Sequence, residues 1–460
     1  MKLDYKRTLC VGFAFFLITM FWQAYDTLVP KILCDKFGLS QAASGTVMAL
    51  DNIFALFLLP LFGALSDKTR SRFGRRTPYI VIGTLLASLA FIALAFVDAM
   101  QTARIAHIAP NDTSLAEKAA ATVAEDPALL IWFIALLLVL LLSMAVFRSP
   151  AVALMPDVTP KPLRSRGNAV INLMGAVGGI AVLVLGILFG TGKEENRLMS
   201  FRNMILVVSI LMLLSLLVFL LTVKEPKLVR KMEEESRALG IAEDAPDGNT
   251  AEGKKRLLRG ERVSLVCILA AVALWYMGYN AVTTKYSLYA GEVLHQDYNS
   301  TLIVAQAVAI VSYLPIGALS ARLGRKKTIL VGVFCLFSSF LVASFLRAGT
   351  PIAVMYVFFA LAGFGWAAIS VNSFPMVVEL SRGGDVGKYT GYYYTASMAA
   401  QVLTPILSGV FMDLTNGMTA LFPYATVFVA LSFLSMLFVR HGDARPTGRE
   451  VIETALSQED

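Results

Sequence analysis

The sequence predicts an all-α membrane protein with twelve transmembrane helices in two pseudo-symmetric six-helix halves. Three observations lead to this prediction. The chain is 57% hydrophobic and only 16% charged, whereas about 25% of the residues in soluble domains are charged. The hydrophobic residues fall in runs of about 20, which is the length of helix that crosses the hydrocarbon core of a bilayer. The two halves of the chain also share a sequence repeat.

The apolar runs define the helices in chain order, and the polar stretches between them define the loops. They divide the chain into an N-terminal half (1–223), a cytoplasmic linker (224–262), a C-terminal half (263–440) and a cytoplasmic tail (441–460). The stretch 242–253 within the linker is too polar to bury a core, and we expect it to be flexible. The twelve predicted spans are 9–31, 41–65, 77–98, 128–149, 167–190, 203–223, 263–289, 300–320, 328–347, 351–377, 389–412 and 420–440.

The basic residues predict the orientation of these spans. Both termini and every second loop share one side of the membrane, and that side holds 31 of the 40 Lys and Arg residues. Cytoplasmic loops are enriched in Lys and Arg, so we expect both termini in the cytoplasm and the chain in the cell membrane. The net charge of +8 has the same origin, and we expect no nucleic-acid partner.

A repeat relates the two halves. The sequence Gly63-Ala-Leu-Ser recurs from Gly317 at an offset of 254 residues, and the same offset maps Tyr25-Asp26 onto Tyr279-Asn280. A glycine followed by two basic residues comes after both copies, at Gly74 and at Gly324. One offset that links two distant sites indicates two parallel six-helix units. Such units are typical of the major facilitator fold, in which the substrate binds between the halves near the middle of the membrane.

The loop between the second and third spans carries the most specific motif. It reads PLFGALSDKTRSRFGRRTPYI from Pro60 to Ile80. This motif resembles the loop of two facilitator groups, the glycoside–pentoside–hexuronide cation symporters and the sucrose/proton symporters. The stretch from Arg148 to Asp157 also resembles the sucrose-type carriers. The resemblance implies a carrier of a small-molecule substrate, with a sugar as the expected substrate, and it implies no enzymatic activity.

The motif loop is the expected cytoplasmic gate. Asp67 lies among basic residues at the end of the second span, where a carboxylate can pair with arginine in one conformation and separate in the other. The alternative is a solvated basic loop that only fixes topology. Arg148 lies at the predicted cytoplasmic end of its span, and we expect it to belong to the gate as well. The other gating candidates are Gly63, Arg72, Gly74, Arg75, Arg76, Gly317, Arg322, Gly324 and Arg325.

Ionisable residues within apolar spans are the best candidates for a binding site, because each is costly unless it is partnered or hydrated. Asp26 and Asp51 lie at similar depth in the first two spans. We expect Asp26 chiefly to bind substrate and Asp51 chiefly to carry a proton; structural hydrogen bonds are the alternative for both. Further substrate-binding candidates, for which packing, snorkelling or interhelical bonding are the alternatives, are Gln23, Tyr25, Asn52, Tyr279, Asn280, Lys285, Asn372 and Gln401.

The second span also bears on the coupling ion. In the melibiose-type carriers, the residue before the proline of this span and the residue four positions earlier are carboxylates that bind sodium. Here these positions are Leu59 and Ala55, and sodium needs several oxygen ligands. We therefore favour proton-coupled import of a disaccharide or related glycoside. A sodium-coupled symporter, an exporter or exchanger of another small organic solute, and a non-transporting membrane receptor remain as alternatives.

Few residues in the sequence suit catalysis or metal binding. The three histidines lie outside the apolar spans, and the four cysteines have no metal-binding spacing. We therefore expect no catalytic residue, no metal and no cofactor. The expected surroundings are the lipid bilayer, and the expected form is a monomer.

Overall fold

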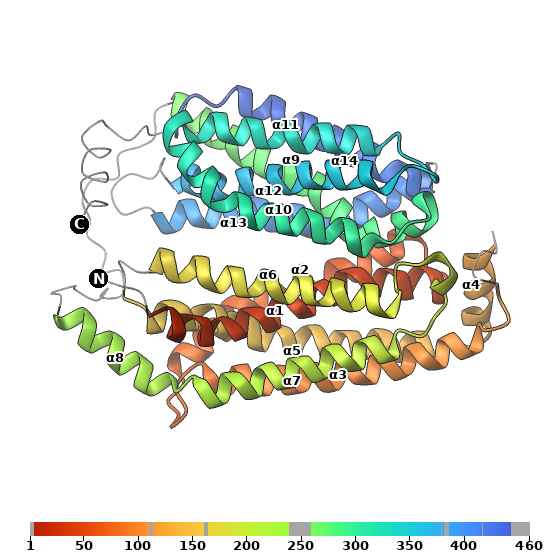
Figure 1. The fold of residues 1–460 in the computed structure, drawn as a ribbon, viewed down its shortest axis with the longest axis horizontal. Coiled ribbons are helices and arrows are strands. Elements are labelled where there is room, and N and C mark those ends of the chain that lie inside the picture. The colour runs from red at the N-terminus through yellow and green to blue at the C-terminus, as the bar shows by residue number, and fades with distance from the viewer. Residues whose placement is uncertain are drawn as a thin grey trace. The chain divides into compact units, whose positions relative to one another are not determined.

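The computed structural model describes residues 4–109, 114–160, 164–238, 259–378, 380, 386–415 and 417–442, and these form helices and loops only (Figure 1). Each predicted span falls on one long helix. Within these described residues, eleven helices are long and apolar enough to cross a membrane, and the predicted span 300–320 lies in a further helix, α10. The helices are α1 (Tyr5–Lys31), α2 (Gln41–Lys68), α3 (Thr77–Arg104), α4 (Leu115–Glu125), α5 (Ala128–Val158), α6 (Arg164–Phe189), α7 (Arg202–Thr222), α8 (Glu225–Ala238), α9 (Arg259–Tyr289), α10 (Tyr298–Leu323), α11 (Arg325–Ala343), α12 (Ile352–Val378), α13 (Val386–Leu414) and α14 (Leu421–Leu437).

The chain divides into two compact units by its internal contacts. Unit 1 contains Met1–Gly248, Thr283–Ile303 and Pro405–Leu414, and unit 2 contains Asn249–Val282, Val304–Thr404 and Thr415–Asp460. Unit 1 thus includes the predicted N-terminal half together with two short pieces of the predicted C-terminal half. The boundaries of the two halves stay a prediction.

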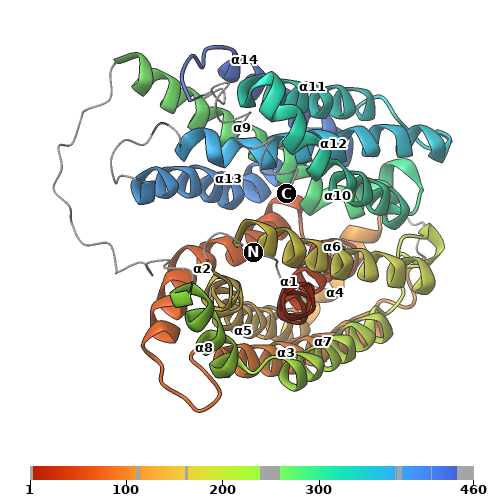
Figure 2. The same cartoon turned by 60° about the vertical axis from the view of Figure 1, so that its left-hand side comes forward.

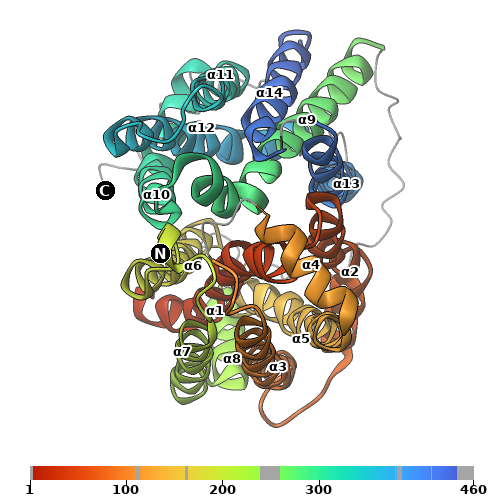
Figure 3. The same ribbon diagram turned by 90° about the vertical axis from the view of Figure 1, so that its right-hand side faces the viewer.

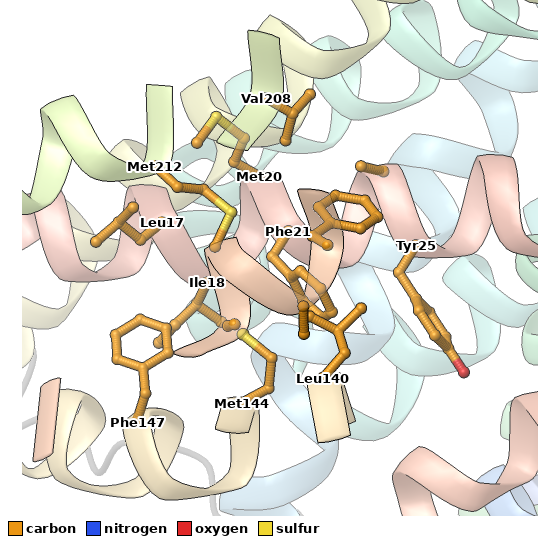
Figure 4. Close-up of a cluster of buried hydrophobic side chains, with 14 of the residues drawn as sticks. Leu17, Ile18, Met20, Phe21, Tyr25, Leu140, Met144, Phe147, Val208 and Met212 are labelled. Atoms are coloured by element: carbon orange, nitrogen blue, oxygen red, sulfur yellow. The ribbon is translucent and has the colours of Figure 1, made fainter. Parts of the chain in front are cut away.

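The core of unit 1 is built around α1, which packs against α5, α6 and α7. Apolar side chains from three of these helices meet at its centre, among them Leu17, Phe21, Met144 and Met212 (Figure 4). On α6, Gly178 allows a close approach, because a Cβ atom there would lie 2.4 Å from the carbonyl oxygen of Phe16. This close packing of α1 fixes where its polar side chains lie.

In unit 2, α11 packs against α12 and α14. Gly332 and Gly365 face each other between α11 and α12, and a Cβ atom on either would lie within 2.8 Å of the other residue's carbonyl oxygen. The helices α9 and α14 are joined by Ser432, whose hydroxyl donates to the carbonyl oxygen of Ala271 at 2.9 Å. Small residues and hydroxyl groups are the usual means by which membrane helices pack.

Two helices lie outside the predicted spans. The helix α4, in the loop between the third and fourth spans, packs on the short π-helix η1 (Ile32–Lys36) that continues α1 (Figure 3). The helix α8, at the start of the predicted linker, packs on α5 (Figure 2). The linker therefore begins with an ordered helix, and its stretch 242–253 lies outside the described residues.

Candidate functional site

Three charged side chains of unit 1 come together inside the helical bundle. They are Asp26 of α1, Asp51 of α2 and Arg148 of α5; each is partly buried, and the three charges interact with one another. Asn52 donates from Nδ2 to Oδ1 of Asp51 at 2.7 Å. With both acids ionised this cluster has one more negative than positive charge, so one proton would neutralise it.

The position of Arg148 corrects the sequence prediction, which placed it in the cytoplasmic gate. The helix α5 contains Pro150 and Pro156 and still continues to Val158. Arg148 is consequently inside the helix, and its guanidinium carbon lies 5.4 Å from the centre of the Trp22 ring. Cations are attracted to the face of tryptophan at such distances. The signal that could have revealed this placement is the apolar run after Arg148, which is too hydrophobic for a loop.

Two hydrogen-bond donors on α1 lie beside the charged cluster. The indole Nε1 of Trp22 and the hydroxyl of Tyr25 are buried and have no hydrogen-bond partner among the described residues. Tyr25 interacts electrostatically with both Asp26 and Asp51, and its hydroxyl points away from the apolar cluster (Figure 4). Buried polar groups are almost always hydrogen-bonded, so these two are suited to a ligand. Gln23 lies on the same helix and is partly buried.

Aromatic side chains gather in unit 2, where sequence analysis predicted substrate contacts. Tyr279 of α9 stacks on Trp366 of α12, with ring centres 3.8 Å apart and planes inclined by 17°. Trp275 packs edge-on against Trp366 at 5.2 Å and is buried. Tyr279 and Trp366 are only partly buried. The pair therefore forms a rigid aromatic surface that Trp275 supports from one side.

Two of the other predicted polar positions of unit 2 bond within their own helices. Asn372 is buried and donates to the carbonyl oxygen four residues before it at 2.9 Å. Gln401 donates in the same way at 3.3 Å. Asn280 follows Tyr279 on α9 and is partly buried. The roles of these three residues in substrate binding stay predictions.

Lys285 belongs to unit 1 rather than to the aromatic group. Its ammonium is buried and donates to the backbone oxygen and to Oε1 of Gln41, at 2.8 and 2.9 Å. Gln41 is the first residue of α2. These bonds hold the start of α2, and they account for the burial of Lys285 without a ligand. Its predicted contact with substrate is untested.

The predicted gate forms a network at the other end of α2. Arg76 pairs with Asp67, and it also donates from Nε to Asp157 of α5 at 2.8 Å. Arg75 pairs with the same Asp157 at 2.7 Å. The motif loop therefore joins the ends of α2, α3 and α5 through charged hydrogen bonds, which are about twice as strong as neutral ones.

The residue that anchors this loop, Glu225 of α8, was not predicted from the sequence. Its buried carboxylate accepts hydrogen bonds from the backbone N–H groups of Arg75, Arg76 and Thr77 at 2.8 to 3.0 Å. It thereby caps the start of α3, where free N–H groups attract negative charge. Gly74 has a φ of +107° and leaves no room for a side chain beside this carboxylate. No sequence pattern links position 225 to the motif, so only the fold reveals the contact.

The repeat motif has the same local geometry in both units. The hydroxyl of Ser66 donates to the carbonyl oxygen of Gly63 at 2.8 Å, and that of Ser320 donates to the carbonyl oxygen of Gly317 at 3.0 Å. Gly324, the counterpart of Gly74, also has a positive φ, at +90°. The gating roles of all these residues, and of Arg72, Arg322 and Arg325, stay predictions.

Long apolar helices, a charged cluster inside the bundle and an ion-paired loop at the helix ends define a multi-pass membrane carrier. The chain belongs to the Major Facilitator Superfamily, whose family model matches residues 11–312 and 296–457. It is therefore a transporter rather than an enzyme.

Curated relatives match shorter stretches. An uncharacterized symporter of Synechocystis is 26% identical over 218 residues, which are 45% of this chain and 37% of the relative. The sucrose transport protein SUC3 of Arabidopsis thaliana is 30% identical over 153 residues, 33% of this chain and 24% of the relative. A putative glycoside/cation symporter of Escherichia coli, YagG, is 34% identical over 64 residues, 14% of each. The matches thus span well under half of each relative.

Solved structures match over nearly the whole chain. The xylose transporter XylE of E. coli has a TM-score of 0.65 at 14% identity, with 97% of this chain and 98% of that chain covered. The nucleoside transporter NupG has a TM-score of 0.61 at 15% identity, with 94% and 98% covered. At these identities the similarity establishes the fold, and it does not distinguish between a sugar and another solute.

Proposed function

We propose that this chain imports a disaccharide or related glycoside together with a proton, by alternating access, across the cell membrane. The observation that carries the proposal is the cluster of Asp26, Asp51 and Arg148 inside the helical bundle. Ionisable groups inside a membrane protein commonly serve as ion and proton sites. The same class of activity is supported by relatives named an uncharacterized symporter, a sucrose transport protein and a putative glycoside/cation symporter.

The surroundings of Asp26 and Asp51 support different roles for the two acids. Asp26 is on the same helix as the free donors of Trp22 and Tyr25. A carboxylate beside such donors offers a sugar both acceptors and donors, which is what hydroxyl groups require. Asp51 has the amide of Asn52 as a close neighbour. We assign substrate binding chiefly to Asp26 and proton transfer chiefly to Asp51, with Arg148 balancing the charge of one carboxylate.

The aromatic surface of unit 2 supports a sugar as the substrate. The flat stack of Tyr279 on Trp366 is rigid and partly exposed. Aromatic faces bind the apolar C–H faces of pyranose rings, while the ring edges leave hydroxyl groups free for hydrogen bonds. Such a surface suits a glycoside better than a small charged solute.

Sodium coupling is the nearest alternative, since one relative is named a glycoside/cation symporter. Sodium requires several oxygen ligands, and the positions that supply them in the melibiose-type carriers are Leu59 and Ala55 here. A single carboxylate suffices for a proton. An exporter or exchanger would differ in the direction of net flux, and a receptor would bind solute without moving it.

The test uses purified protein in proteoliposomes and a panel of labelled glycosides. An inward proton gradient should drive accumulation of at least one disaccharide, and a sodium gradient at constant pH should not. Accumulation driven by sodium alone would overturn the proton assignment. Binding of sugar without counterflow would favour the receptor.

A further inference from the structure

The first helix of each sequence repeat ends in the same unusual way. The helix α1 continues into the π-helix η1 (Ile32–Lys36), and α9 continues into the π-helix η4 (Ala290–Leu294). π-Helical turns are rare and often lie at functional sites. Each carries one acidic residue, Asp35 in η1 and Glu292 in η4. Both lie in unit 1, at the end of α1 away from the Asp67 loop.

A single arginine joins these two acids. Arg197, in the loop between α6 and α7, donates from Nε and Nη2 to Oδ1 of Asp35 at 2.9 and 2.7 Å. The same Nη2 donates to Oε1 of Glu292 at 2.9 Å. The side chain of Asp35 is only 2% exposed, so its charge needs this partner to be stable. The planar guanidinium presents several donors at once and can bridge two carboxylates, which an ammonium does less well.

Arg197 keeps its positive charge in this contact. Burial alone would lower the pKa of Arg197, but the charges of Asp35 and Glu292 and the hydrogen bond to Asp35 raise it above its ordinary value. The arginine therefore stays protonated at any physiological pH. Loss of the proton from Arg197 therefore does not open this contact.

The loop that carries Arg197 makes further contacts beside the two π-helices, with the end of α1 and the start of α10. Lys31, at the end of α1, donates to the backbone oxygen of Thr191 at 2.9 Å. The Thr191 hydroxyl bonds with that of Tyr298, the first residue of α10, at 2.9 Å. A small cavity beside the bridge is lined by Arg197, Asp35 and Glu292, among others. The loop thus links η1 to the corner between α9 and α10. Among the described residues, Arg197 is the only residue of this loop that forms ion pairs with both Asp35 and Glu292.

We propose that Arg197 is a gating residue: it holds the ends of α1 and α9 together and must release a carboxylate each time the carrier opens on that side. The proposal rests on transport by alternating access, and it adds a second gate at the end of the helices away from the Asp67 loop. Because one arginine contacts both π-helical ends, the two ends cannot separate without the loss of at least one charged contact.

The test measures access to the interior and needs no substrate. The four native cysteines are replaced by serine, and a reporter cysteine is introduced at Asn52. Its rate of reaction with a membrane-impermeant maleimide is measured in sealed right-side-out and inverted vesicles. Arg197→Gln should raise the rate roughly tenfold, from the side on which Arg197 lies, because charged hydrogen bonds are lost. An unchanged rate in a folded Arg197→Gln protein would overturn the proposal.

Arg104→Gln is the matched control. Arg104 also pairs with an acid near the same end of the helices, Asp126 at 2.9 Å, and its hydrogen bonds among the described residues go to Asp126 rather than to either π-helix. Its loss should leave the labelling rate unchanged. An increase as large as that of Arg197→Gln would mean that any lost ion pair loosens this end, and the specific role of Arg197 would be refuted.

A second variant covers the case in which Arg197→Gln does not fold, since it leaves Asp35 buried without its partner. Glu292→Gln keeps both bonds from Arg197 to Asp35 and removes only the charge on η4. It should increase labelling on the same side, by less than Arg197→Gln. A rate equal to that of the parent would contradict the bridge. Sugar counterflow, measured separately, tests the proposed function. The gating proposal and the proposed function can therefore fail independently.

Discussion

The charge of Arg148 determines what the two neighbouring carboxylates can do. A guanidinium inside a membrane protein is costly unless acids balance it, and Asp26 and Asp51 supply that balance. One of the two acids suffices for neutrality. We propose that the other acid takes up and releases a proton during the transport cycle.

Asp51→Asn removes the group to which we assign the proton. The variant should lose uphill accumulation driven by a pH gradient and keep downhill exchange of sugar, because an amide cannot titrate but can still hydrogen-bond. Both activities are measured in the same vesicles, with Asp126→Asn as a control at an exposed acid. Accumulation by Asp51→Asn against a gradient would contradict the assignment.

Asp26→Asn should instead weaken sugar binding itself. A carboxylate accepts stronger hydrogen bonds from hydroxyl groups than an amide does, so we expect a loss of roughly tenfold in affinity. Equilibrium binding of the transported glycoside to purified protein provides the measurement. If Asp26→Asn loses coupling and Asp51→Asn loses binding, the two roles are exchanged.

Tyr25→Phe tests the free donor beside the acids. The hydroxyl of Tyr25 is buried and has no hydrogen-bond partner in the described part of the chain, so its removal should cost the protein no stability and should weaken sugar binding by roughly fivefold. Thermal unfolding in detergent and equilibrium binding are measured together. A lower melting temperature with unchanged affinity would show that the hydroxyl has a structural role.

At the scale of single residues, the sequence predicts the places of some side chains in the structure and not of others. Asp26 and Asp51 could be predicted because an acid within an apolar run is conspicuous and expensive. Arg148 was misplaced because it lies near the end of a run and is followed by Pro150, which suggests the end of a helix. The partner of Lys285, Gln41, is distant in sequence, and a contact of this kind depends on tertiary packing that no local pattern encodes.

At the scale of elements, α8 is tied to the motif loop through Glu225. Glu225→Gln weakens the acceptor for the N–H groups at the start of α3. Loss of such a cap costs about 1 kcal/mol, so we expect a lower melting temperature. Glu234→Gln is the matched control, because Glu234 is an exposed acid on the same helix. Equal melting temperatures for the two variants would refute the capping role.

Asp67→Asn tests the gate. The substitution weakens the contact with Arg76, which lies at the end of α2 away from Asp51. Transport should slow while equilibrium sugar binding stays close to that of the parent protein. A well-folded variant that no longer binds sugar would contradict the separation of gate from binding site. The motif predicted this contact, but it gave no sign of Glu225, which lies far away in the sequence.

At the scale of the whole molecule, the helices could be predicted because the thickness of the bilayer sets their length. The predicted spans missed α4 and α8, since neither crosses the membrane and hydrophobic length is the only strong signal. The extent of α5 was underestimated for the same reason. The division into units could not be predicted, because it depends on contacts between helix ends that are remote in sequence.

Two exposed positions test the orientation. Single cysteines at Asp126, before α5, and at Glu234, on α8, are both well exposed. An impermeant thiol reagent should label position 126 in intact cells and position 234 only after the membrane is opened. The expectation follows from the excess of Lys and Arg on the side with both termini. Labelling of position 234 in sealed cells would reverse the orientation.

The most direct test of the central claim, that sugar and proton move together, is the proton flux that sugar itself drives. Proteoliposomes containing the transporter are prepared without a pH gradient, and a disaccharide that the protein exchanges is added outside. The external pH should rise as protons enter with the sugar, and the rise should be absent with Asp51→Asn although sugar still equilibrates. Uptake of the sugar by the parent protein with no change in pH would contradict proton coupling.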